Sequence, residues 1–231
     1  MRRLILIVFT LMIALPANAQ ECVVLLHGLA KTERDMRKLE RRLTSEGFKA
    51  INLGYKSRSD SIKQLSSDAV SSALENCGDY KEVHFVTHSM GGILVRQYLL
   101  NHEIDKLGRV VMLGPPNQGS EAVDSYQDVP GFKMIGGPAG LQLGTGVLSV
   151  PRQLGAVEFD LGIIAGTRSV NLILSTILPG KDDGKVSVES TKVDGMNDHI
   201  AMPVTHPFMM KNKRVINQVV HFIRAGEFSR E

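Results

Sequence analysis

The sequence predicts an α/β protein, a three-layer α/β/α sandwich around a mostly parallel sheet of about six strands. Two observations predict it. Short runs of consecutive apolar residues, such as Cys22–Leu26, are typical of strands buried on both faces. Segments with the apolar spacing of helices alternate with these runs, as in parallel sheets covered by helices. The 231 residues fit a single domain over residues 20–231, with no large cap domain.

The first half of the predicted fold contains two helices and two further strands. Over Arg34–Glu46, apolar residues recur at the spacing of one helix face, and Gly47 is placed to end that helix. A short strand over Ala50–Leu53 follows. A second amphipathic helix over Ser61–Asn76 then leads into a strand over Val83–Val86.

The second half continues the alternation. A helix over Gly91–Asn101 and a strand over Val110–Leu113 come first. Later apolar runs predict strands over Leu161–Ala165 and His199–Val204. A closing helix over Lys213–Arg224 has an apolar stripe that faces the core.

A glycine-rich excursion, Ser120–Asp160, interrupts this alternation. It holds seven glycines and three prolines, and only Glu121–Tyr126 has the pattern of a short helix. Long connections in a compact domain are often functional, so the excursion is a candidate lid over a binding site. A packed, irregular connection is the alternative interpretation.

The first 19 residues have the pattern of a secretory signal peptide. Arg2 and Arg3 precede the apolar run Leu4–Leu15, and small residues then lead to a cleavage site after Ala19. The alternative is a membrane anchor, but the apolar run is shorter than the roughly 20 residues of a membrane span. We therefore expect cleavage of residues 1–19, a secreted or periplasmic location, and no stable membrane span.

Composition excludes several classes of protein. Hydrophobic residues make up 43% and charged residues 22% of the chain, which is ordinary for a globular protein and excludes disorder. The net charge is +3, and without Arg2 and Arg3 there are 25 basic against 24 acidic side chains. A balance this even, without a long basic run, argues against a nucleic-acid partner. Two cysteines are too few for a cysteine-rich metal site, so we expect no metal.

The two cysteines are candidates for a disulfide, because export would place them in an oxidising compartment. Cys22 begins the first predicted strand, and Cys77 ends the helix before the strand over Val83–Val86. If those two strands are parallel neighbours, both cysteines lie at the same edge of the sheet. We therefore expect a bond between Cys22 and Cys77.

The most informative stretch places Ser89 at the turn between a buried strand and a helix. A serine hydroxyl becomes a useful nucleophile when a sharp strand-to-helix turn lifts it from the sheet, and this turn requires very small neighbours. The usual pattern is G-x-S-x-G. Here Gly91 fills the second glycine position, Gly92 follows, and Thr87 replaces the first glycine. An ordinary strand-to-helix turn is the alternative interpretation.

A second element fits that chemistry. Nucleophilic attack on an ester creates an oxyanion, which preorganised backbone N–H groups stabilise. The expected donors are the N–H groups of Met90, next to the serine, and Leu29, after the first strand. We assign His27, Gly28 and His88, beside these donors, to substrate binding. His27 is expected to be a structural residue of its loop rather than a base.

Five segments together resemble the α/β-hydrolase superfamily, specifically its small bacterial lipase/esterase-like serine hydrolases. They span nearly all of residues 22–206, and the resemblance implies a minimal α/β-hydrolase fold. It also implies a nucleophilic serine, then an acid, then a histidine, in that order along the chain. The segments are Val24–Leu29, Val86–Gly92, Gly114–Ser120, Asp183–Val186 and Val204–His206.

Within that order, Ser89 is followed by Asp183 as the expected acid and His206 as the expected base. His206 follows the last predicted strand, at the edge of the sheet where ligands bind in open α/β folds. His199 begins that strand and is the alternative base. Asp183 lies in a segment that resembles the acid loop of the family, and Asp182 is the alternative.

These observations predict a secreted serine hydrolase that cleaves carboxylic esters, with lipid-type esters favoured by the resemblance. A small-molecule or lipid ester is the expected partner, and an acyl-enzyme the expected intermediate. No cofactor is expected, since no nucleotide-binding glycine loop of the required form is present. The alternatives are an acyltransferase or thioesterase with the same triad, or a catalytically silent binding protein with this fold.

Overall fold

The computed structural model describes residues 20–126, 131–170 and 175–230, so the predicted signal peptide lies outside the described residues. Six strands form one sheet in the order β2-β1-β3-β4-β5-β6, and every neighbouring pair is parallel. The strands are β1 (Cys22–Leu26), β2 (Lys49–Leu53), β3 (Val83–His88), β4 (Leu107–Leu113), β5 (Leu161–Gly166) and β6 (Asp198–Met202).

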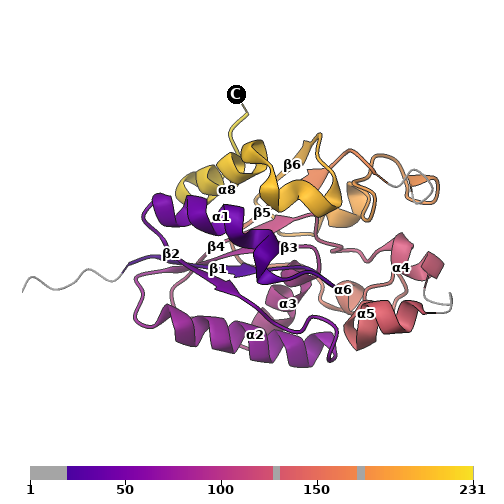
Figure 1. Ribbon diagram of the computed structural model, residues 1–231, viewed down its shortest axis with the longest axis horizontal. Helices are drawn as coiled ribbons and strands as arrows, with labels where there is room; N and C mark the ends of the chain where they lie inside the picture. Colours follow the sequence, from indigo (N-terminus) through magenta and orange to yellow (C-terminus); the bar gives the residue numbers. More distant parts are fainter. Residues whose placement is uncertain (1–19, 127–130, 171–174, 231) are drawn as a thin grey trace, which may run out of the picture.

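Helices cover both faces of this sheet (Figure 1). The helices α1 (Glu33–Ser45) and α8 (Lys213–Ala225) pack on one face, and α2 (Ile62–Cys77) and α3 (Met90–Leu99) pack on the other. The predicted three-layer sandwich is confirmed. Within the described ranges, none of the helices combines the length and the apolar character that crossing a bilayer requires.

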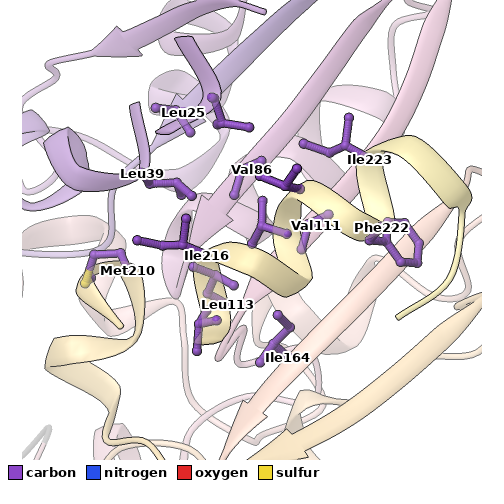
Figure 2. Close-up of a cluster of buried hydrophobic side chains, with 14 of the residues drawn as sticks. Leu25, Leu39, Val86, Val111, Leu113, Ile164, Met210, Ile216, Phe222 and Ile223 are labelled. Atoms are coloured by element: carbon purple, nitrogen blue, oxygen red, sulfur yellow. The ribbon is translucent and has the colours of Figure 1, made fainter. Parts of the chain in front are cut away.

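Alternate strand side chains point to opposite faces and form two buried layers. Figure 2 shows the layer between the sheet and the helices α1 and α8. Burying one such aliphatic or aromatic side chain contributes about 1.5–3 kcal/mol. The strands contribute Leu25, Val86, Val111, Leu113 and Ile164 to this layer, and the helical segments contribute Leu39, Met210, Ile216, Phe222 and Ile223.

Local chemistry sets the ends of these elements. The side chain of Ser61 accepts a hydrogen bond from the N–H of Gln64 (3.3 Å), so this serine caps α2 rather than beginning it. The last strand was expected over residues 199–204 but ends at Met202. Pro203 follows, and its ring nitrogen has no hydrogen to donate to the sheet.

The described part of the excursion Ser120–Asp160 contains three short helices near one end of the sheet (Figure 1). They are α4 (Glu121–Tyr126), α5 (Phe132–Leu141) and α6 (Val150–Gln153). The side chain of Gln142 accepts a hydrogen bond from the N–H of Ile62 at the start of α2 (2.7 Å). In this structure the described part of the excursion therefore packs against the domain. The buried cluster at this contact includes Ile62, Met90, Ile93, Ala139, Leu143 and Leu154.

The predicted disulfide between Cys22 and Cys77 is present. It joins the first residue of β1 to the last residue of α2, across a Cα–Cα distance of 5.9 Å. Both side chains are fully buried among the apolar residues under α2. The bond closes a loop of 55 residues and ties α2 to the edge of the sheet where the strands begin.

Replacing both Cys22 and Cys77 with alanine is expected to lower the free energy of unfolding by about 2–4 kcal/mol. The reason is that the bond restricts the unfolded chain over a long loop. Urea unfolding of the two proteins measures the effect, and thiol titration of the unreduced protein should find no free thiol. An unchanged urea midpoint, or two titratable thiols, would contradict the prediction.

Candidate active site

Ser89 lies at a sharp turn between β3 and α3. Its backbone has φ 54° and ψ −124°, a strained conformation for a residue with a side chain. The N–H of Ser89 donates a hydrogen bond to the carbonyl oxygen of Leu113 at the end of β4 (2.8 Å), which holds the turn. The serine remains partly exposed, while Met90 directly after it is fully buried.

The neighbours of this turn leave no room for larger side chains. A Cβ atom on Gly91 would lie 2.6 Å from the carbonyl oxygen of Leu26 in β1. A Cβ atom on Gly92 would lie 3.2 Å from the hydroxyl of Thr87. Thr87, which replaces the usual first glycine, is thus accommodated beside a glycine of the following helix.

The loop after β1 approaches the serine from the other side. A Cβ atom on Gly28 would lie 3.0 Å from the Cβ of Ser89. The N–H of Lys31 donates to the carbonyl oxygen of Gly28 (3.2 Å) and closes a turn in which Ala30 has φ 54°. Among the described residues, the N–H of Leu29 has no acceptor, so it is free to act as an oxyanion donor.

Asp183 and His206 form a buried hydrogen-bonded pair. His206 Nδ1 lies 2.7 Å from Asp183 Oδ2, and the backbone N–H of His206 donates to the carbonyl oxygen of Asp183 (2.9 Å). The second carboxylate oxygen accepts hydrogen bonds from the N–H groups of Lys185 (3.0 Å) and Val186 (2.9 Å). The pair therefore fixes a proton on Nδ1 and leaves Nε2 able to accept one.

Gly114 shapes the same site, and the sequence analysis did not single it out as a site residue. A Cβ atom on Gly114 would lie 2.9 Å from Asp183 Oδ2 and 3.1 Å from His206 Nδ1, and the glycine has φ 55°. Its position directly after β4 was the available signal, since Ser89 and His206 also follow strand ends.

The alternative acid and base lie in other surroundings. The carboxylate of Asp182 accepts hydrogen bonds from the N–H of Gly184 (2.7 Å) and the hydroxyl of Ser175 (2.8 Å). His199 Nε2 lies 2.9 Å from the hydroxyl of Thr191, near the start of β6. Of the two aspartates, the structure brings Asp183 to His206, while the catalytic roles stay predictions.

The side chain of His88 is buried and lies against His206 of the Asp183–His206 pair. Its buried ring is 4.7 Å from the ring of His206, and its Nε2 lies 3.0 Å from the carbonyl oxygen of His206. Since a carbonyl oxygen only accepts, Nε2 carries the proton. His88 thereby helps to hold the backbone of the loop that carries His206, a role that the sequence analysis did not foresee.

His27 is also enclosed. Its ring stacks on Tyr55 at a centroid distance of 4.1 Å, and its Nδ1 lies 2.9 Å from the carbonyl oxygen of Gly28. The side chain of His27 is fully buried. The assignments of His27, Gly28 and His88 to substrate binding stay predictions.

Arg96, on α3, is a further residue that the sequence analysis missed. Its buried guanidinium donates to the side-chain oxygen of Asn117 (3.0 Å) and to the carbonyl oxygen of Gly155 (2.6 Å). Burial lowers its pKa to about 10. Arg96 therefore ties the helix after the serine to the loop after β4 and to the end of the excursion.

Among the described residues, a cluster at the opposite edge of the sheet has residue types that can bind a metal: Glu21, Glu82 and His84. His84 Nδ1 accepts a hydrogen bond from the backbone N–H of Arg109 (2.9 Å). The proton of the neutral ring therefore lies on Nε2, which faces Glu82 at 3.5 Å and Glu21 at 3.8 Å. This tautomer suits a hydrogen-bond donor and not a metal ligand.

The backbone is similar to those of solved bacterial proteins, two of which are named as a lipase and an esterase. Bacillus licheniformis lipase BlEst2 in its mature form matches with a TM-score of 0.67 and 19% identity, over 92% of this chain and 94% of that one. The lin2722 product of Listeria innocua matches with a TM-score of 0.61 and 16% identity, over 92% and 96%. The Exiguobacterium antarcticum esterase EaEST matches with a TM-score of 0.59 and 17% identity, over 90% and 93%.

At these identities the likeness establishes the fold, which is the α/β-hydrolase fold. No protein-family model matches the sequence, and no curated protein sequence matches it.

The buried histidines make stability depend on pH. Burial lowers the pKa of His27, His84, His88 and His199. Unfolding returns each pKa to about 6.5, so below that pH the unfolded chain binds more protons than the folded one. The free energy of unfolding should therefore fall as the pH drops from 7.5 to 5.5, by up to about 1.4 kcal/mol per pH unit for each such histidine.

Urea unfolding at several pH values measures this slope. Replacing His199 with glutamine should reduce the slope, because one of the four rings no longer takes up a proton on unfolding. A stability that is constant from pH 7.5 to pH 5.5 would contradict the prediction.

Proposed function

We propose that this protein is a serine hydrolase that cleaves carboxylic esters with Ser89, His206 and Asp183. One observation carries the proposal: the hydrogen-bonded pair of Asp183 and His206 lies at the edge of the sheet where the strands end, and the strained turn of Ser89 lies at the same edge. The fold shared with proteins named as lipases and esterases supports it.

In the proposed reaction, the hydroxyl oxygen of Ser89 attacks the ester carbonyl carbon while His206 Nε2 takes the hydroxyl proton. The oxyanion of the tetrahedral intermediate accepts hydrogen bonds from the N–H groups of Leu29 and Met90. The intermediate then breaks its bond to the alcohol, which leaves with the proton held by His206. Asp183 keeps the imidazole in the required tautomer and stabilises its charged form.

Hydrolysis completes the cycle. A water molecule gives a proton to His206 Nε2 and attacks the acyl carbon, and the second tetrahedral intermediate again places its oxyanion on the two backbone N–H groups. Its collapse breaks the bond to Ser89, whose oxygen recovers the proton from His206. The products are one carboxylic acid and one alcohol.

We propose lipid-type esters as the substrate class. Several large apolar side chains are exposed on segments that follow the ends of strands, on the catalytic side of the sheet. They are Met134, Val147, Leu148 and Phe208. Exposed apolar side chains on this side of the sheet suit contact with an apolar ligand.

We also propose that the protein is exported through the predicted signal peptide. The Cys22–Cys77 disulfide suits an oxidising compartment.

A fluorophosphonate probe should label the purified protein at Ser89, because the probe traps a serine that a neighbouring base activates. Peptide mapping by mass spectrometry identifies the labelled residue. The Ser89→Ala variant is the control and should lose the label while keeping its unfolding midpoint. Absence of label on a well-folded protein would favour a catalytically silent binding protein.

Replacing Asp183 with asparagine should lower kcat on 4-nitrophenyl butyrate by about 10⁴-fold, because the amide no longer holds the tautomer of His206. Asp182→Asn is a matched control: it makes the same change at the preceding, also buried aspartate, whose carboxylate bonds to Gly184 and Ser175. Kinetics and circular dichroism are measured on both variants. If the Asp182 variant loses turnover while the Asp183 variant keeps it, the acid is misassigned.

A further inference from the structure

A cavity of about 660 Å³ lies beside the loop that carries the proposed oxyanion donor Leu29. Its walls come from the loop after β1, the loop after β2 and the start of α5. Three of the lining residues are cationic, namely Lys31, Lys56 and Arg58, and none is acidic. The hydroxyl-bearing residues Thr32, Ser57 and Ser59 line the same space. We call this space the cationic cavity.

The three charged groups of the cationic cavity have no direct partner among the described residues. Within the described part of the chain, the charged groups of Lys31, Lys56 and Arg58 make no hydrogen bond and no ion pair. The nearby acidic residue Asp35 pairs directly with Lys211 at 2.9 Å and accepts the N–H of Thr32. Against the opposing effect of burial, these hydrogen bonds and the charge of Lys31 hold the pKa of Asp35 below its usual value. A group of cations without direct partners has the chemistry of an oxyanion site.

The cationic cavity is close to the catalytic serine. The hydrogen-bonded turn from Gly28 to Lys31 brings their Cα atoms within about 7 Å of each other. At the other end of this turn, a Cβ atom on Gly28 would lie 3.0 Å from the Cβ of Ser89. Burial and the ring of His206 lower the pKa of His88 well below its usual value, and the charge of Lys31 adds to this effect.

Backbone contacts hold the walls of the cationic cavity in place. The hydroxyl of Ser57 accepts a hydrogen bond from the N–H of Ala30 (3.0 Å), which joins the two loops. A Cβ atom on Gly137 in α5 would lie 2.1 Å from the carbonyl oxygen of Arg58. Helix α5 therefore packs directly on the backbone that presents Arg58, and its residue Met134 adds an exposed apolar group to the rim.

We infer that the cationic cavity binds an oxyanion, a phosphate or a carboxylate, carried by the ester substrate itself. The inference rests on the proposed hydrolase function and narrows its substrate class to anionic esters. The charges of Lys31, Lys56 and Arg58 would hold the anionic group, while the ester carbonyl reaches Ser89. The binding energy from this remote group positions the ester for attack.

Two water-soluble esters test the inference: 1-hexanoylglycerol 3-phosphate and 1-hexanoylglycerol, which share the same ester bond and differ in the phosphate. The wild-type protein should show a higher kcat/KM for the phosphorylated ester, and the ratio of the two values should fall as salt is added, because salt screens exposed charges. Arg58→Gln should lower this ratio about threefold, and Lys31→Gln with Arg58→Gln about tenfold. The Arg58→Lys variant keeps the positive charge and should retain most of the wild-type ratio.

The matched control is Lys81→Gln, which removes one positive charge from an exposed side chain at the opposite edge of the sheet. It should leave the ratio unchanged. Inorganic phosphate should compete with the phosphorylated ester and leave hydrolysis of the neutral ester unaffected. The inference is overturned by any of three results: a wild-type kcat/KM ratio near one, a ratio that is unchanged in the double variant, or inhibition of neutral-ester hydrolysis by phosphate.

Calorimetry separates this inference from the proposed hydrolase function. Binding of glycerol 3-phosphate is measured to the wild-type protein and to the Lys31→Gln, Arg58→Gln variant. If neither ester is cleaved but binding is present and lost in the variant, the oxyanion site stands and the hydrolase function falls. If both esters are cleaved equally and glycerol 3-phosphate does not bind, the hydrolase function stands and the oxyanion site falls.

Discussion

The left-handed backbone of Ser89 is the constraint on which the rest of the site depends. A residue with a side chain loses about 1–3 kcal/mol in such a conformation, so the surroundings must impose it. The N–H of Ser89 donates a hydrogen bond to Leu113 in β4. Gly28 lets the loop after β1 lie close to the Cβ of Ser89, and Gly91 lets the start of α3 lie close to the carbonyl oxygen of Leu26 in β1. Each contact requires β3 to lie between β1 and β4, which is the observed order of the sheet.

The parallel sheet also explains why distant residues meet. Ser89 follows β3, Gly114 follows β4, Asp183 lies in the connection after β5, and His206 follows β6. Because the strands are parallel, all four positions lie at the same edge. The buried carboxylate of Asp183 then needs partners, and two backbone N–H groups and the imidazole provide them.

Some of these structural features can be predicted from the sequence, and others cannot. The sheet, the layers and the disulfide were predictable, because periodic apolar runs and the positions of two cysteines determine them. The pairing of Asp183 with His206 followed from a resemblance and from strand order. The contact of His88 with His206 was not predictable, since it depends on the direction of one ring. The cationic cavity was not predictable either, because its charges come from two loops that are separate in the sequence.

The near-zero net charge of residues 20–231 conceals an unequal distribution. At the edge where strands begin, basic groups have acidic partners, as in the pairs of Lys81 with Glu21 and Arg109 with Asp160. At the edge where strands end, Lys211 pairs with Asp35, but the charged groups of the cationic cavity make no direct ion pair among the described residues. Helices that follow parallel strands begin at this edge, and their dipoles add positive potential there. In the proposed reaction this field would draw an anionic ester to the edge that holds Ser89. It would also stabilise the negative charge formed by the proposed attack of the serine.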